Sequence, residues 1–253
     1  GRIAKPIRIA ENGKAKCEII ADYSDAILVD KFFPRNGKWS LFLREYRGKE
    51  KEAMRYAADE LSRWLGVVTG RAEVPVLLEP STNKDVKIFL GGTYAKGKFD
   101  ADLRTLAGDG TTSYDGYGIR VRDGNIYIFS PTPSGVLFGV YDFVENNTDI
   151  IWAFNGDLED GTVFTESPTL DIVWADTVSK PAFTWRALWL EQMGLRNGFN
   201  MNHEYGWWVN GGHYLSPQYY TSSEGMTRFN PVLDRYAGDG KTREKDWTEG
   251  RTL

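Results

Sequence analysis

The residues best suited to chemistry in this sequence fall in one aromatic-rich stretch, residues 181–220. It holds both histidines of the chain and ten aromatic residues, namely Phe183, Trp185, Trp189, Phe199, Tyr205, Trp207, Trp208, Tyr214, Tyr219 and Tyr220. Aromatic rings pack on the C–H faces of sugar rings, and they equally fill a protein core or an interface. We therefore predict Trp207, Trp208 and Tyr214 as substrate-binding residues, with packing inside the protein as the alternative.

His213 follows two glycines, Gly211 and Gly212. Because glycine lets a backbone approach a ligand closely, we interpret this run as a binding loop in which His213 donates a hydrogen bond to a hydroxyl group. A loop histidine with a purely structural hydrogen bond is the alternative. His203 and His213 are ten residues apart, a spacing that matches no helical or turn-based set of metal ligands. We predict no metal site and no cofactor.

Acid–base cleavage of a sugar linkage needs two carboxyl groups, one on each side of the bond. The stretch after residue 180 offers Glu191, Glu204, Glu224, Asp234, Asp239 and a few acids near the end of the sequence. None of them has neighbours of the kind that hold a carboxyl group protonated. We interpret them as surface carboxylates and leave the catalytic residues unassigned, with Glu191 or Glu204 as the candidates if the chain is a complete small enzyme.

The composition argues against several classes of protein. A net charge of −4 with both signs mixed along the 253 residues disfavours a nucleic-acid partner, which would need a basic stripe. Cys17 is the only cysteine, so neither an internal disulfide nor a thiolate zinc site can form. No apolar run reaches the ~20 residues that a membrane-spanning helix needs. The sequence starts at Gly1 without a signal peptide, and we expect one to have been removed.

Two amphipathic helices are predicted upstream of the aromatic stretch. From residue 50, apolar side chains recur at steps of three and four up to Leu65, and charged residues, Glu60 among them, occupy the other face. This helix should end between Gly66 and Gly70. Residues 134–146 carry a second apolar stripe, which is made up of Leu137, Val140, Tyr141 and Val144.

Short apolar runs bounded by proline, glycine or asparagine predict strands. These runs are residues 26–29, 39–46, 74–78, 86–90, 117–121, 126–129, 150–154 and 170–174. Asp123-Gly124-Asn125 predicts a hairpin, because both turn positions tolerate a positive φ. Gly91-Gly92 predicts a tight turn rather than a phosphate loop, since no further glycine-rich motif accompanies it. The order of elements indicates an α+β fold, with a mixed β-sheet and two main helices on one of its faces.

A domain boundary is predicted near residue 178. Residues 176–181 are polar and end in a proline, and a new apolar strand follows at 183–190. We therefore divide the sequence into a first domain, residues 1–178, and a second part, residues 179–253. The second part starts with the aromatic stretch and becomes polar from Thr221 onward.

Three segments of the sequence together form a recognisable arrangement. The first is residues 57–61 (AADEL), the second is residues 115–119 (DGYGI) running through the hairpin to residues 135–145 (GVLFGVYDFVE), and the third is residues 180–186 (KPAFTWR). In this order they resemble the N-terminal domain that precedes the catalytic (β/α)8 barrel in family-20 β-N-acetylhexosaminidases and family-67 α-glucuronidases. The resemblance is closest to relatives that contain the domain of unknown function 4838, and it covers about residues 50–215.

Two places depart from the pattern of these families. Ser134-Gly135 stands where they often have Arg-Gly, and residues 149–152 (DIIW) stand where they have Gly-x-Arg-Trp. Neither place supplies an arginine for a charged role at the domain junction. In the family-20 enzymes, the arginine that matches Arg186 hydrogen-bonds sugar hydroxyls, so the resemblance implies a substrate-binding role for Arg186. A structural pairing of Arg186 is the alternative.

The resemblance implies a glycoside hydrolase that acts on complex carbohydrate and is exported by a bacterium to the periplasm or the extracellular space. Residues 179–253 would then be the first elements of an incomplete (β/α)8 barrel, whose remainder is the expected partner of the first domain. The relatives' catalytic carboxylates lie on later barrel strands, so we expect this chain alone to lack them. The alternative is a self-contained carbohydrate-binding or surface-interaction module.

Overall fold

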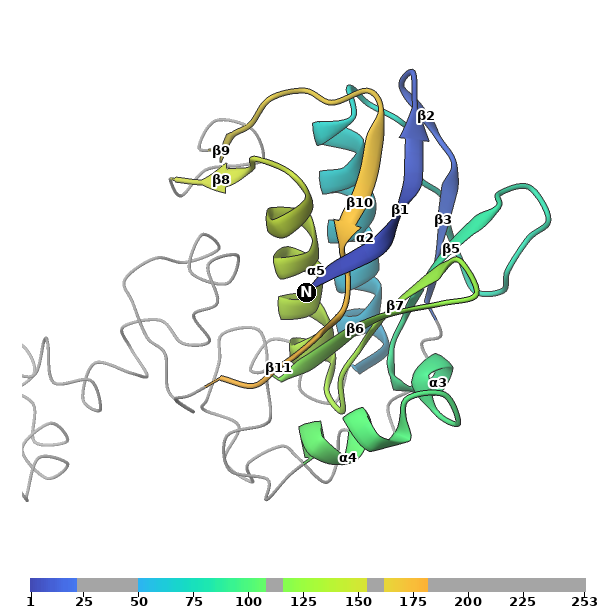
Figure 1. Ribbon diagram of the computed structural model, residues 1–253, viewed down its shortest axis with the longest axis vertical. Coiled ribbons are helices and arrows are strands. Elements are labelled where there is room, and N and C mark those ends of the chain that lie inside the picture. Colours follow the sequence, from blue (N-terminus) through green and yellow to red (C-terminus); the bar gives the residue numbers. More distant parts are fainter. Residues whose placement is uncertain (22–49, 108–115, 154–161, 182–253) are drawn as a thin grey trace, which may run out of the picture.

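The computed structural model describes residues 1–21, 50–107, 116–153 and 162–181 (Figure 1). The strands predicted at residues 26–29 and 39–46 lie outside the described residues. So do the predicted opening of a barrel and the aromatic stretch after Pro181. The prediction of a boundary near residue 178 therefore stays a prediction.

A six-stranded mixed sheet forms the centre of the fold, in the order β11-β6-β7-β5-β3-β4. Its strands are β3 (Cys17–Ala21), β4 (Val76–Leu77), β5 (Val86–Leu90), β6 (Tyr117–Arg122), β7 (Asn125–Phe129) and β11 (Thr177–Ser179). β3 is parallel to β4 and β5, and β5 is parallel to β7, whereas β6 is antiparallel to both β7 and β11. The predicted mixed sheet of an α+β fold is confirmed. Asp123 and Gly124, with φ of 52° and 74°, form the predicted hairpin turn.

A second sheet has three strands in the order β10-β1-β2. The sequence predicted β10 but neither β1 nor β2. β1 (Arg2–Glu11) pairs with β10 (Leu170–Trp174) and forms a hairpin with β2 (Lys14–Ala15). Asn12 and Gly13 take φ of 50° and 73° in the turn, as a two-residue hairpin requires. Only Lys16 separates β2 from β3, so the chain passes directly from the small sheet into the large one.

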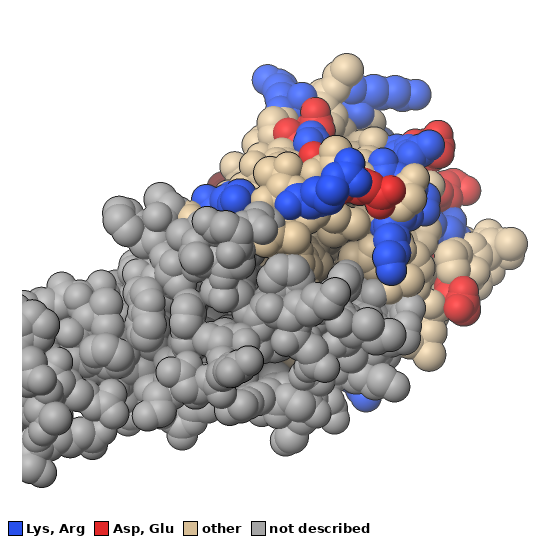
Figure 2. Space-filling view, turned by 90° about the horizontal axis from the view of Figure 1, so that it is seen from below, with Lys and Arg blue, Asp and Glu red and all other residues tan. Residues whose placement is uncertain are grey.

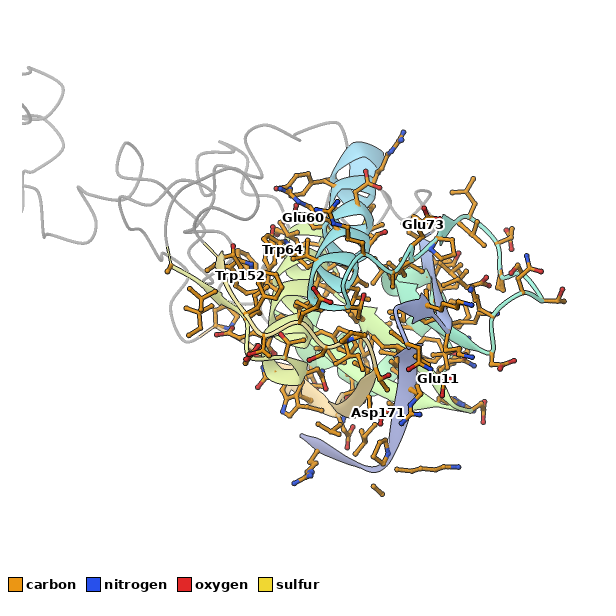
Figure 3. The ribbon with its side chains drawn as sticks, turned by 90° about the horizontal axis from the view of Figure 1, so that it is seen from above. Glu11, Glu60, Trp64, Glu73, Trp152 and Asp171 are labelled. Atoms are coloured by element: carbon orange, nitrogen blue, oxygen red, sulfur yellow. The ribbon has the colours of Figure 1, made fainter. Side chains whose placement is uncertain are left out.

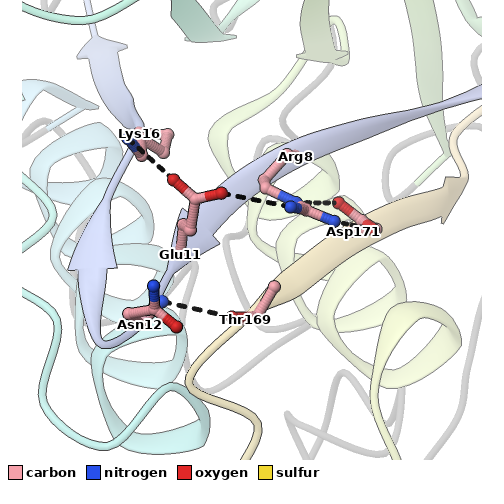
Figure 4. Close-up of polar contacts among 6 residues, drawn as sticks. All are labelled: Arg8, Glu11, Asn12, Lys16, Thr169 and Asp171. Atoms are coloured by element: carbon pink, nitrogen blue, oxygen red, sulfur yellow. Dashed lines mark hydrogen bonds and ion pairs between the residues drawn. The ribbon is translucent and has the colours of Figure 1, made fainter.

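An ionic chain crosses the exposed face of this small sheet (Figure 4). Arg8 donates two hydrogen bonds to Asp171, at 2.9 and 3.0 Å, and a third to Glu11 at 3.2 Å. Glu11 also pairs with Lys16 at 3.0 Å. The backbone N–H of Asn12 donates to Thr169. These contacts tie the hairpin to β10, although their exposure to water keeps each contribution to stability small.

Helices α2 (Glu50–Val68) and α5 (Pro133–Asn147) pack against each other on one face of the large sheet, side by side in Figure 1. Both were predicted, as was their placement on one face. The alternation of β5 and β7 points Ile88, Ile126 and Ile128 toward these helices, where they share one core with Ile9 and Ile172 of the small sheet. The two sheets and the two helices therefore enclose a single hydrophobic core.

Two short helices, α3 (Gly92–Ala95) and α4 (Asp100–Ala107), cover part of the opposite face and were not predicted. The alternation of the same strands directs Phe89, Tyr127 and Phe129 to this side, where they pack with Ala95 and Leu106. The Phe89 and Tyr127 rings stack with centroids 4.9 Å apart. The sheet is therefore covered on both faces, by the two long helices on one side and by aromatic side chains under α3 and α4 on the other.

An arginine fastens α4 to the sheet. Arg120 on β6 donates to both carboxylate oxygens of Asp102, at 2.8 and 3.1 Å, and it also pairs with Asp176 just before β11. A bidentate arginine–carboxylate pair has strong directional preference and so fixes the orientation of both elements. Figure 2 shows basic and acidic side chains beside one another on the part of the described surface that is visible from below.

The remaining described strands, β8 (Ile151–Trp152) and β9 (Thr162–Val163), form a two-stranded antiparallel pair. The sequence predicted β8 as part of a longer run at residues 150–154, and β4 as part of a run at 74–78. In both cases, only two residues of the run pair with another strand among the described residues, so the strand is shorter there than the apolar run. β5 matches its predicted bounds.

Candidate functional site

The residues predicted to bind substrate are Arg186, Trp207, Trp208, His213 and Tyr214. All of them lie outside the described residues, as do Glu191 and Glu204. Their proposed roles therefore stay predictions. Any functional site in the described part of the chain must be formed by other side chains.

A buried carboxylate connects α2 to α5. Glu60 on α2 is 3% exposed, and its Oε2 accepts hydrogen bonds from Trp64 Nε1 at 3.0 Å and from the Tyr141 hydroxyl at 2.7 Å. Its Oε1 pairs with Arg63 Nη1 at 3.1 Å. The helical periodicity predicted Glu60 on the charged, solvent-facing side of α2, and this prediction is wrong. Glu60 lies at the border of the apolar stripe, where indole and phenol donors replace water.

Trp152 of β8 completes what we call the Glu60 cluster: Glu60, Arg63, Trp64, Tyr141 and Trp152. Figure 3 labels Glu60, Trp64 and Trp152 of this cluster. The Trp152 ring meets those of Trp64 and Tyr141 edge-on, with centroids 5.6 and 5.5 Å apart. Glu60 belongs to the first segment of the sequence resemblance and Tyr141 to the second. Trp152 ends the run at 149–152 that departs from the family pattern. Residues that are far apart in the sequence therefore meet in one packed unit.

The residue types of the Glu60 cluster are those of a sugar-binding site, but their burial points to a structural role. Trp64, Tyr141 and Trp152 are 0%, 2% and 3% exposed, so no ring face is available for a sugar to stack on. A buried carboxylate that accepts several hydrogen bonds from fixed donors orders the elements that supply them. The cluster therefore joins α2, α5 and β8, and it is not a catalytic centre.

A second buried carboxylate, Glu18 on β3, faces the other side of the large sheet. Glu18 accepts hydrogen bonds from the backbone N–H and the hydroxyl of Ser81, at 2.7 and 2.5 Å, and pairs with Lys87 at 2.9 Å. Burial alone would raise the pKa of Glu18, but these donors together hold the pKa below its usual value. Since Glu18 and Glu60 lie on opposite sides of the sheet, they cannot flank one bond as a glycosidase pair must.

A third group of carboxylates lies in the last turns of α5. Burial raises the pKa of Asp142. Partial desolvation and the charge of Asp142 raise the pKa of Glu145, although the Glu145 residue is exposed at the surface. The Tyr117 hydroxyl hydrogen-bonds with Asp142 and with Ser179 of β11, and burial raises its pKa as well. Asp142 and Glu145 are one turn apart on one helix, so both would lie on the same side of a ligand. Their arrangement ties α5 to β6 and β11 but does not suit acid–base cleavage.

Cys17 is fully buried, and burial raises the pKa of its thiol to about 12, so it does not act as a nucleophile. Within residues 1–21, 50–107, 116–153 and 162–181, no group of three histidine, cysteine, aspartate or glutamate side chains could hold a metal ion. In the same residues, no helix combines the length and the apolar character needed to cross a membrane.

No family model matches the sequence, and no curated protein matches it either. Among solved structures, the chain is similar to the family-20 β-N-acetylhexosaminidase of Streptomyces coelicolor A3(2), at 15% identity and a TM-score of 0.38, over 74% of this chain and 26% of the enzyme. It is also similar to a mutant Streptomyces plicatus β-hexosaminidase in complex with its product GlcNAc, at 18% identity and a TM-score of 0.33.

A further structure of the Streptomyces plicatus enzyme, in complex with Thio-NAglucal, matches at 17% identity and a TM-score of 0.33. The chain spans about a quarter of the length of these enzymes. Identities and TM-scores of this size describe a resemblance in part of the chain and do not place it in the family.

Proposed function

We propose that this chain is the N-terminal region of a glycoside hydrolase that acts on complex carbohydrate. In this proposal, residues 1–178 are an accessory α+β domain, and residues 179–253 are the first elements of a catalytic (β/α)8 barrel. The accessory domain packs against the barrel and stabilises it, and the chain alone does not catalyse hydrolysis. Export to the periplasm or the extracellular space belongs to the same proposal.

The observation that supports the proposal best is that two of the segments that carry the family resemblance contact each other in the fold. The AADEL segment lies in α2, and the segment at 135–145 lies in α5. Glu60 of the first accepts a hydrogen bond from Tyr141 of the second across 81 positions of sequence. These segments occur in the same order in the family-20 and family-67 enzymes and in relatives with the domain of unknown function 4838. A shared buried polar contact gives a physical reason for such residues to occur together.

Arg186 is the substrate-binding residue on which the proposal depends most. It would stand near the carboxyl end of the first barrel strand, the end at which barrel enzymes carry their active sites. The planar guanidinium offers five N–H donors and can bridge neighbouring sugar hydroxyls. Trp207, Trp208 and Tyr214 would supply stacking surfaces, and His213 would donate to a further hydroxyl. The proposal needs neither a metal nor a cofactor.

Limited proteolysis combined with saccharide binding tests the proposal. If residues after about 180 are the opening of a barrel, a protease should cut there first and leave a resistant fragment that ends near Pro181. Arg186→Ala should weaken saccharide binding by about tenfold, as expected for loss of a hydrogen bond with a charged donor. Arg196→Ala, in the same segment, is the matched control. One cooperative, protease-resistant unit of all 253 residues would instead support the self-contained binding module.

A further inference from the structure

A surface pocket of about 470 Å³, largely open to solvent, lies beside the C-terminal half of α2. It is lined by Ser62, Ala72, Glu73, Val74, Pro75 and Lys84. We call it the Glu73 pocket. Figure 3 shows Glu73 and Trp152 on different sides of α2, so the pocket is separate from the Glu60 cluster. Its volume falls in the range of about 300–1,000 Å³ that small-molecule sites occupy.

The wall of the Glu73 pocket that contains Ala72, Glu73 and Val74 is held in place by the end of α2. Gly70 and Arg71 take φ of 72° and 73°, which turns the chain back along the helix. The Arg71 N–H donates to Gly66 O at 2.7 Å, and the Ser62 hydroxyl donates to Val74 O at 2.7 Å. A left-handed backbone costs a residue with a side chain about 1–2 kcal/mol, so the surrounding contacts must fix it.

The opposite wall, which contains Lys84, is held in place by contacts with the large sheet and with β2. The Lys84 ammonium donates to Ala15 O at 2.7 Å, which fixes the side chain that lines the pocket. The Lys87 ammonium donates to the carbonyl oxygen of Lys84. Glu18 holds Ser81 in the same loop. Both walls are therefore fixed before any ligand arrives, and a preformed site loses less entropy on binding.

The polar groups of the Glu73 pocket retain capacity for a ligand. The Glu73 carboxylate is exposed, and it forms no hydrogen bond or ion pair with the part of the chain that the structure describes. The Lys84 ammonium carries three N–H donors and uses one of them on Ala15. The Ser62 hydroxyl donates to Val74 O and keeps its lone pairs as acceptors. One acceptor group, one donor group and one hydroxyl therefore surround the cavity.

The charge balance decides between classes of ligand. Glu73 and Lys84 carry opposite charges, so the lining as a whole neither attracts nor repels a net charge. Sugar hydroxyls donate and accept hydrogen bonds at the same time, and they can therefore satisfy the carboxylate and the ammonium together. Ala72, Val74 and Pro75 offer an apolar surface for the C–H face of a sugar ring. A neutral saccharide fits this combination better than an anion or a cation does.

We propose that the Glu73 pocket is a binding site for a neutral saccharide unit. The site lies entirely within the described domain and goes beyond the proposed hydrolase function, because it needs no residue after Pro181. In an enzyme that acts on a long carbohydrate, it would give the polymer an additional point of attachment.

The test is a titration of the 253-residue chain, followed by the backbone amide NMR signals of the pocket. The probes are the β-1,4-linked disaccharide of N-acetylglucosamine, cellobiose, glucuronate, glucosamine and glycine betaine. We expect the two neutral disaccharides to bind with dissociation constants on the order of 1 mM. They should shift the signals of Glu73, Val74 and Lys84, and the charged probes should do so more weakly.

Glu73→Ala is the decisive variant, because the exposed carboxylate can be removed without disturbing the fold. It should weaken the disaccharide-induced shifts of Val74 and Lys84 by about tenfold, whereas Glu79→Ala, in the neighbouring loop, should leave them unchanged. Arg186→Ala must also leave these shifts unchanged, which separates this pocket from the proposed barrel site. Disaccharides that shift none of these signals, Glu73→Ala binding as well as the parent, or preferential binding of glycine betaine would each overturn the proposal.

Discussion

Tyr141→Phe tests the structural role of the Glu60 cluster most directly. The substitution removes only the hydroxyl that donates to Glu60 Oε2 at 2.7 Å and leaves the packing of the ring on Trp152 intact. A hydrogen bond to a charged group contributes about 1.5–3 kcal/mol, and Glu60 is too deeply buried for water to replace the donor. We expect the free energy of unfolding to fall by about 2 kcal/mol. For a domain of this size, that is a drop in Tm of about 4–8 °C.

Urea denaturation followed by tryptophan fluorescence measures this change, because Trp64 and Trp152 lie in the cluster itself. Tyr127→Phe is the matched control, since Tyr127 is buried in the aromatic layer and its hydroxyl forms no hydrogen bond with the described residues. A double-mutant cycle with Glu60→Gln isolates the pairwise energy. If Tyr141→Phe costs no more than Tyr127→Phe, or if the cycle gives no coupling, the cluster does not hold α2 to α5 in the way described.

Three further substitutions have expected outcomes. The pKa of Glu18 is held below its unfolded value, so its contribution to stability is present above about pH 4.3 and is lost as the pH falls through the lowered pKa. Glu18→Gln should therefore flatten the fall in Tm between about pH 5 and pH 3, and an unchanged acid slope would contradict this. Partial desolvation and the charge of Asp142 raise the pKa of the exposed Glu145, so its ionised form costs a small amount of stability above that pKa. Glu145→Gln should raise Tm at pH 7 but not at pH 4, and an equal effect at both pH values would rule out the titration. In Gly139→Ala, the new Cβ would lie 2.8 Å from Ile128 Cγ2, closer than packed carbon atoms approach. We expect a loss of about 1–3 kcal/mol in urea denaturation, and a neutral effect would show that α5 can shift away from the sheet.

The elements with a local signal could be predicted from the sequence. The helix at residues 50–68 and the one at 133–147 have an apolar stripe of helical period, and β5 is an apolar run bounded by polar residues and glycine. β1 was missed because Lys5, Pro6 and Arg8 break the alternation that identifies a strand. The pair Asn12-Gly13 was the available signal, since this dipeptide favours a two-residue hairpin turn.

The side-chain networks could not be read from the sequence in the same way. Periodicity put Glu60 on the charged face of the helix, but its burial depends on Tyr141, which is 81 positions away. The Glu73 pocket likewise depends on where the loop of Lys84 returns beside α2. Each of these contacts is set by tertiary packing, whereas helical and strand patterns report only on neighbours within a few residues. The sugar contact of Arg186, which the family resemblance implies, concerns a residue outside the described part of the chain.

The buried carboxylates limit where chemistry can occur in this molecule. Glu18 and Glu60 are buried and accept hydrogen bonds from fixed donors, so neither carboxylate is accessible to a substrate. Asp142 and Glu145 share one helix face and cannot act from opposite sides of a bond. The exposed carboxylate of Glu73 is different, because it stands in a cavity with capacity to accept hydrogen bonds, yet its lining offers no second carboxylate. A single carboxylate in a neutral pocket can bind a sugar but cannot cleave it by the two-carboxylate route. If the proposed saccharide site is correct, the Glu73 pocket holds carbohydrate, and hydrolysis by this route would need carboxylates that its described lining does not supply.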